Sequence, residues 1–212
     1  MSQAIPQVIA GIALGLGLIT PIGAQNLFII QLGIDVGFPK VFYGTVAATA
    51  CDALLISAGT LGLGSVVQSN HLLRAALLAG GGCFLTFLAY REVRSSSISD
   101  EVATVSVASP AGIARRAAGV TLLNPHAILD TVGVIGAVAV TRTGVDKLWF
   151  AGGTVMASLV WFLVLGTAGF IIRNRLTAKR RKVISVGSAL VMMGFAVMMF
   201  VEFVQNLDAA QQ

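Results

Sequence analysis

Two carboxylic acids lie deep inside apolar stretches of the sequence, where acidic side chains are costly. Asp52 is about midway along the apolar run Val41–Val67, and Asp130 lies ten residues before the end of the run Ile113–Val140. A charge at the centre of a membrane helix costs roughly 2.5–3.5 kcal/mol. All 14 basic residues lie between the apolar runs or at their ends, so neither acid has an obvious cation at its own depth. A proton, a metal cation or a cationic substrate would have to compensate for these acids.

A purely structural role is the alternative for both acids, with each carboxyl protonated and hydrogen-bonded to its neighbours. His126 precedes Asp130 by four residues, so the two share one helix face if the helix continues past Pro125. They would then form a proton relay or contact a substrate together, whereas packing is the alternative role for His126. A metal site is disfavoured, because the other histidine, His71, lies at the edge of an apolar run and no cysteine is suitably spaced with His126.

Two apolar runs are interrupted midway by residues that break helices. The run Val8–Leu32 contains the segment Thr20–Asn26, and the run Ile113–Val140 contains Asn124–Thr131. An interrupted membrane helix exposes backbone N–H and C=O groups, which is tolerated only where they line a cavity or are buried in protein. The amides nearby could bind a carboxylate or an amino group, or else cap helix ends. The residues of interest are the helix breakers Pro21, Gly23 and Pro125, and the amides Gln25, Asn26 and Asn124.

The runs that position these residues are long enough to cross a bilayer. Of the 212 residues, 56% are hydrophobic and only 11% are charged, whereas a soluble domain carries roughly 25% charged residues. About 20 helical residues cover about 30 Å of hydrocarbon, and continuous runs of this kind differ from the alternating segments of a membrane barrel. The sequence predicts an all-α membrane protein of about six transmembrane helices, formed by the runs Val8–Leu32, Val41–Val67, Leu72–Tyr90, Ile113–Val140, Leu148–Ile172 and Val183–Val204.

A serine-rich stretch divides the chain into two halves of three helices. Residues 1–90 form the first half, 91–112 a cytoplasmic linker and 113–212 the second half, all within a single transport domain. Because each half has an odd number of spans, the second half enters the membrane from the opposite face. A duplication would therefore be an inverted repeat, with a broken first helix in each half, as in many secondary transporters.

The basic residues are distributed unevenly along the chain. Eleven of the 14 lie in the first, third and fifth connections between apolar runs. The positive-inside rule then predicts that the odd-numbered connections are cytoplasmic and that both termini lie outside. The cluster Arg173–Lys182 is expected to contact anionic lipid headgroups of the bilayer, and no nucleic-acid partner is expected.

No arrangement of residues in the sequence predicts an enzyme. Serine, histidine and aspartate do not occur at the spacing of a nucleophile elbow or a zinc protease, and the chain has no glycine-rich phosphate loop with a lysine. We therefore expect neither enzymatic activity nor a cofactor, and we expect that transport is not driven by ATP.

Four segments of the sequence resemble the lysine exporter (LysE) family, particularly its branch of lysine and arginine exporters. They are Pro21–Asn26, Cys51–Gly59, Leu123–Thr131 and Trp149–Phe162. The family usually has proline where this chain has Ala24, within a Gly-Pro-Gln-Asn stretch. The resemblance implies export of amino acids from the bacterial cytoplasm, driven by an ion gradient. The wider superfamily also contains exporters of neutral amino acids and of metal cations, and these remain the alternatives.

Together, the residues and the resemblance predict a secondary exporter of L-lysine or L-arginine in the bacterial inner (plasma) membrane, with protons as the exchanged ion. Moving one positive charge outward costs about 2.3 kcal/mol per 100 mV, and an inward proton cancels that electrical term. Asp52 and Asp130 would hold either the substrate cation or a proton, with His126 beside Asp130. The three amides would hold the substrate carboxylate. The sequence leaves open whether the protein forms a homo-oligomer.

Overall fold

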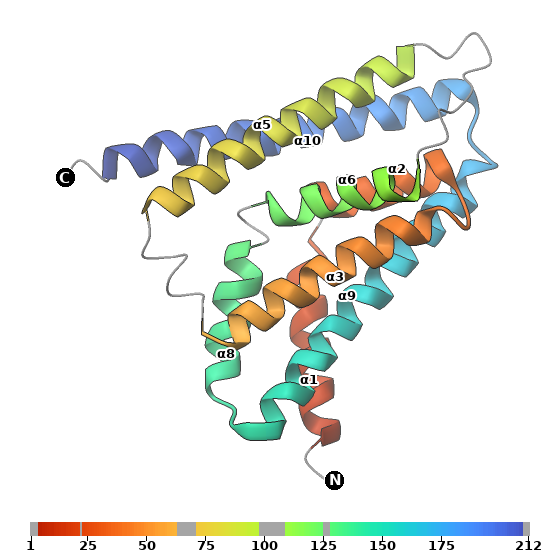
Figure 1. Ribbon diagram of the computed structural model, residues 1–212. Helices are drawn as coiled ribbons and strands as arrows, with labels where there is room; N and C mark the ends of the chain where they lie inside the picture. The colour runs from red at the N-terminus through yellow and green to blue at the C-terminus, as the bar shows by residue number, and fades with distance from the viewer. Residues whose placement is uncertain (1–3, 22, 63–70, 98–108, 125–127, 210–212) are drawn as a thin grey trace.

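The computed structural model describes residues 4–21, 23–62, 71–97, 109–124 and 128–209 (Figure 1). Within these ranges the chain is helical apart from short turns, which confirms the predicted all-α class. The helices are α1 (Ala4–Ile19), α2 (Ala24–Val36), α3 (Val41–Thr60), α5 (His71–Ser97), α6 (Pro110–Leu122), the π-helix η1 (Leu129–Ile135), α8 (Gly136–Val140), α9 (Gly144–Arg173) and α10 (Ala178–Ala209).

The helices of the described residues differ in whether they can cross a membrane alone. Three are long and apolar enough, namely α3, α9 and the part Lys182–Leu207 of α10. A fourth span is formed if α1 and α2, which meet at 85°, count as one bent crossing. The count is lower than six because the run Ile113–Val140 is divided between α6 and η1–α8, and because α5 carries a shorter apolar stretch, Ala75–Arg91. The six-span count stays a prediction.

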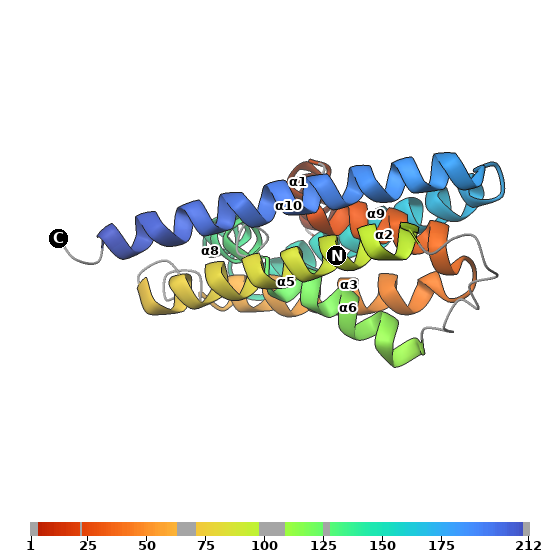
Figure 2. The same ribbon diagram turned by 90° about the horizontal axis from the view of Figure 1, so that it is seen from above.

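Each broken helix packs on a helix from the other half of the sequence. The helices α1 and α2 lie against α9, whereas α6, η1 and α8 lie against α3. The pair α3 and α9 contact each other, and α5 lies beside α10 in both views (Figures 1 and 2). The two halves are thus interleaved, and the two interruptions come to face the same interior.

Glycines allow these helices to approach closely. A side chain added at Gly11 on α1 would collide with the backbone carbonyl of Phe150 on α9, and one added at Gly153 would collide with the carbonyl of Val8. Between α3 and α8, a Cβ at Gly136 would lie 2.8 Å from the carbonyl oxygen of Gly59. Small residues at helix crossings are typical of membrane proteins, because van der Waals packing between close backbones replaces the hydrophobic effect there.

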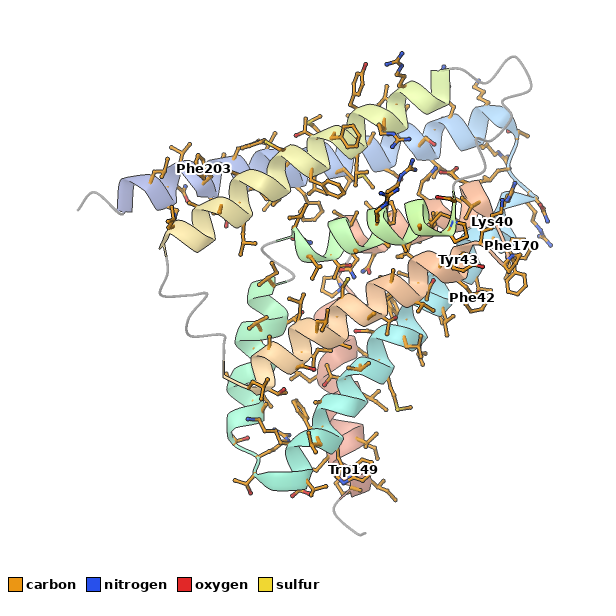
Figure 3. The ribbon with its side chains drawn as sticks, viewed as in Figure 1. Lys40, Phe42, Tyr43, Trp149, Phe170 and Phe203 are labelled. Atoms are coloured by element: carbon orange, nitrogen blue, oxygen red, sulfur yellow. The ribbon has the colours of Figure 1, made fainter. Side chains whose placement is uncertain are left out.

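The basic connections gather at one end of the molecule. The helices α3, α6 and α10 begin there, and α5 and α9 end there (Figures 1 and 2). Figure 3 shows Lys40 and Tyr43 at this basic end and Trp149 far from it, where α9 begins. Amphipathic aromatic side chains at both ends of a helical bundle are typical of the two membrane–water interfaces.

The predicted linker 91–112 is partly helical in the structure. α5 continues through Ser97, and α6 begins at Pro110 behind Ser109, whose hydroxyl accepts a hydrogen bond from the Gly112 amide at 3.1 Å. A polar helix end exposed to solvent needs no apolar periodicity, which is why the sequence pattern did not indicate these turns. Residues 98–108 lie outside the described residues.

Candidate functional site

A cavity of about 310 Å³ lies between the interruptions of the two broken helices. Pro21 and Gly23 reach it from the first interruption and Asn124 from the second. The wall is completed by residues of α1, α3, η1, α9 and α10. Ligand pockets in proteins enclose roughly 300–1,000 Å³, so this cavity has the size for a small ligand.

Asp52 on α3 is the one charged side chain among the described residues that line the cavity. It is only 6% exposed. The Gln25 amide donates to its Oδ1 at 3.4 Å, and the Ser158 hydroxyl on α9 lies close enough to interact with the carboxylate. A bond of 3.4 Å is at the long limit for a hydrogen bond, and a buried carboxylate with neutral partners alone is expensive. The site therefore favours a proton or a cationic group next to Asp52.

Asn26 holds the first interruption in place. Its amide nitrogen donates to the carbonyl of Ile19 at 2.7 Å and to that of Pro21 at 3.0 Å. Carbonyls at the end of α1 have no helical partner of their own, so the Asn26 side chain replaces the missing bonds. Both N–H groups of this amide are occupied, which leaves neither for a substrate carboxylate in this conformation.

The first turn of α2 borders the cavity. Gly23 precedes the helix in an extended conformation and supplies no side-chain cap. Pro21, Gly23, Gln25 and Asn26 all line the cavity, so the beginning of α2 faces it. The free backbone N–H groups and the dipole of a helix N-terminus favour a negatively charged group. The Gln25 side chain therefore links the start of α2, which favours an anion, to the carboxylate of Asp52.

The second interruption is described in part. α6 ends at Leu122, Asn124 has a non-helical backbone and lines the cavity, and its carbonyl accepts a hydrogen bond from the Ile128 amide at 3.0 Å. Thr131, the next residue after Asp130 on η1, also lines the cavity. Short π-helical segments are frequent at functional sites. Pro125, His126 and the side chain of Asp130 lie outside what the structure describes, and their roles stay predictions.

Two hydroxyl residues of α9 belong to the cavity wall and were not among the predicted site residues. Thr154 is buried, and the single proton of its hydroxyl can be donated to the carbonyl of Phe150 at 3.0 Å or to that of Gly11 at 3.2 Å. Ser158 is one turn further along and reaches Asp52. The available signal was their spacing of four residues, which places both hydroxyls on one face of an otherwise apolar helix.

The family model described as LysE type translocator matches residues 16–202 of the chain. The chain belongs to the LysE family. The matched region of this LysE-family chain includes the two interruptions, Asp52 and both α9 hydroxyls. The resemblance seen in the sequence is confirmed, and the chain is a multi-pass membrane transporter rather than an enzyme.

Relatives of this LysE-family chain cover most of its length. "Putative amino-acid transporter YisU" of Bacillus subtilis (strain 168) is 35% identical over 176 residues, which are 82% of this chain and 79% of the relative. "Arginine exporter protein ArgO" of Salmonella paratyphi B is 32% identical over 206 residues, which are 94% of this chain and 95% of the relative. ArgO of Salmonella typhimurium (strain LT2) has the same identity and coverage. No solved structure matches the chain.

Proposed function

We propose that this LysE-family protein exports basic amino acids, L-arginine and L-lysine, from the bacterial cytoplasm in exchange for protons. The observation that carries the proposal is Asp52, a buried carboxylate with neutral hydrogen-bond partners in a cavity of small-ligand size. The relatives named as arginine exporters support arginine as a substrate.

The cavity suits the charges of a basic amino acid. The start of α2 favours the substrate carboxylate, and Asp52 favours a positive group. Gln25 connects the two positions, because it lies in the first turn of α2 and its amide bonds to Asp52. Ser158 steadies the Asp52 carboxylate from the α9 side. Asn124 contributes an amide from the second interruption.

Exchange follows from competition for one carboxylate. A substrate cation and a proton neutralise Asp52 equally well, and they exclude each other from it. Export of one positive charge against the membrane potential costs about 2.3 kcal/mol per 100 mV, and one proton entering returns the same amount. Asp130, with its backbone in η1 next to a cavity residue, is the second acid in this proposal, and His126 would assist it.

Alternating access would come from two inverted repeats, 1–90 and 113–212, joined by the linker 91–112. The packing supports this, because α1–α2 lie on α9 just as α6 and η1–α8 lie on α3. In such a repeat, α3 corresponds to α9 and α5 corresponds to α10. The contacts α3–α9 and α5–α10 then each join two corresponding helices, as the symmetry requires. In a six-span arrangement, the basic end of the molecule would be cytoplasmic and both termini would lie outside.

The proposal is tested in everted vesicles that carry the full-length protein and a pH-sensitive dye. Arginine or lysine should drive proton movement in the wild type, and Asp52→Asn should reduce this signal at least tenfold. Asp146→Asn, the same chemical change in the first turn of α9 and outside the cavity, is the matched control and should retain activity. Undiminished exchange by Asp52→Asn would refute the proposal, and exchange driven by neutral amino acids in its place would establish the alternative substrate class.

A further inference from the structure

A second cavity, of about 280 Å³, lies between α3 and α9 at the basic end of the molecule. We call it the α3–α9 groove. It is lined by Phe38, Val41, Phe42, Thr45, Leu163, Gly166, Thr167 and Phe170. None of these residues lines the cavity around Asp52, so the groove is a separate site.

The groove opens to the outside of the helical bundle. Phe38 is 61% exposed and Phe42 is 39% exposed, whereas Val41 and Thr45 are buried and form the floor. Phe38 packs edge-on against Phe42 with a centroid distance of 5.3 Å, and its ring centroid lies 6.1 Å from that of Phe170. The α3–α9 groove is therefore apolar and has an aromatic wall, at the level where α3 begins and α9 ends.

Positive charges stand at the rim of the groove. Lys40 is two residues from Phe38 in the turn before α3, and Figure 3 shows it near Phe42, Tyr43 and Phe170. The guanidinium of Arg173 lies against the backbone of Gly37, because a side chain added at Gly37 would collide with its Nη1. None of the described groove residues is acidic. A basic substrate finds no counter-charge here, whereas an anionic group does.

We propose that the α3–α9 groove binds an anionic phospholipid, with one acyl chain in the slot and the phosphate on Lys40 and Arg173. The apolar lining accepts hydrocarbon, and basic pockets between membrane helices select anionic headgroups. Tyr43, half-exposed beside Lys40, marks the headgroup level. Both α3 and α9 also contribute residues to the Asp52 cavity, so a bound lipid would contact two helices that form the transport site.

The test is native mass spectrometry of the purified full-length protein, after exchange into detergent that contains phosphatidylglycerol or phosphatidylcholine with identical acyl chains. The wild type should retain one phosphatidylglycerol with clear preference. Lys40→Gln and Arg173→Gln should each lower this retention about fivefold, which corresponds to about 1 kcal/mol per basic side chain. Lys147→Gln, a charge removed at the beginning of α9, is the matched control and should change nothing.

A second variant separates the groove from its charged rim. Thr167 is exposed at the mouth of the slot, so Thr167→Trp fills the slot from outside without disturbing the buried floor. We expect loss of the retained lipid with an unchanged melting temperature. Equal retention of both lipids by the wild type would overturn the proposal. So would a phosphatidylglycerol preference that survives Thr167→Trp, because the headgroup alone would then account for binding.

Discussion

Asn26→Ala separates a structural role of this amide from a role in substrate binding. The substitution removes two hydrogen bonds and leaves the carbonyls of Ile19 and Pro21 without their partner. An unsatisfied buried group costs about 1–3 kcal/mol, so the two together would cost about 2–6 kcal/mol. Both residues border the cavity, where water can reach them, and this favours the lower part of that range, about 2–3 kcal/mol.

The assay is thermal unfolding of the detergent-purified protein. Size-exclusion chromatography measures the fraction that stays folded at each temperature. A loss of about 2–3 kcal/mol corresponds to a melting temperature lower by roughly 4–12 °C for a chain of this size. Asn174→Ala, at the exposed end of α9, is the control and should shift the melting temperature by less than about 2 °C. The reasoning is refuted if Asn26→Ala melts like the wild type while the KM for arginine rises, because the amide would then be a substrate ligand.

Two further predictions concern the packing of α1 on α9 and the partner of the buried acid. Gly11→Ala places a methyl group against a backbone carbonyl of α9, so we expect a loss of about 1–3 kcal/mol and lower yields, measured as melting temperature. Gly17→Ala meets no atom within 4 Å and should melt within about 2 °C of the wild type; equal melting of both variants would contradict the packing. Ser158→Ala removes the hydroxyl that interacts with the Asp52 carboxylate. Because a hydrogen bond to a charged group is worth about 1.5–3 kcal/mol, we expect the KM for arginine to rise about tenfold or more in the vesicle assay. An unchanged KM would exclude Ser158 from the site.

The sequence was informative where a residue is costly in its surroundings. Asp52 stands out in the sequence because an acid inside an apolar run needs compensation, and in the structure it lines the cavity. Pro21 and Gly23 stand out because they interrupt an apolar run, and in the structure they lie between α1 and α2. In each case, the energetic penalty is local and can be recognised without knowledge of the neighbours.

Features that depend on packing were not predictable in this way. Ser158 and Thr154 are ordinary residues for a membrane helix, and only the position of α9 beside α1 and α3 turns them toward the cavity. The role of Asn26 depends on where the carbonyls of α1 end, so the sequence alone is compatible with both a capping role and a ligand role for this amide. The end of α6 at Leu122, by contrast, agrees with the interruption predicted at Asn124–Thr131, because Pro125 disfavours a helical conformation at the residue before it.

The interleaved packing has a consequence for biosynthesis. The bent pair α1–α2 leaves the ribosome more than 100 residues before α9, the helix against which it packs. Contacts between segments so distant in sequence form late in folding. Until α9 arrives, the polar backbone at the bend must be sheltered by lipid headgroups, by the insertion machinery or by its own Asn26. A truncated chain that stops before α9 should therefore be a target for membrane proteases.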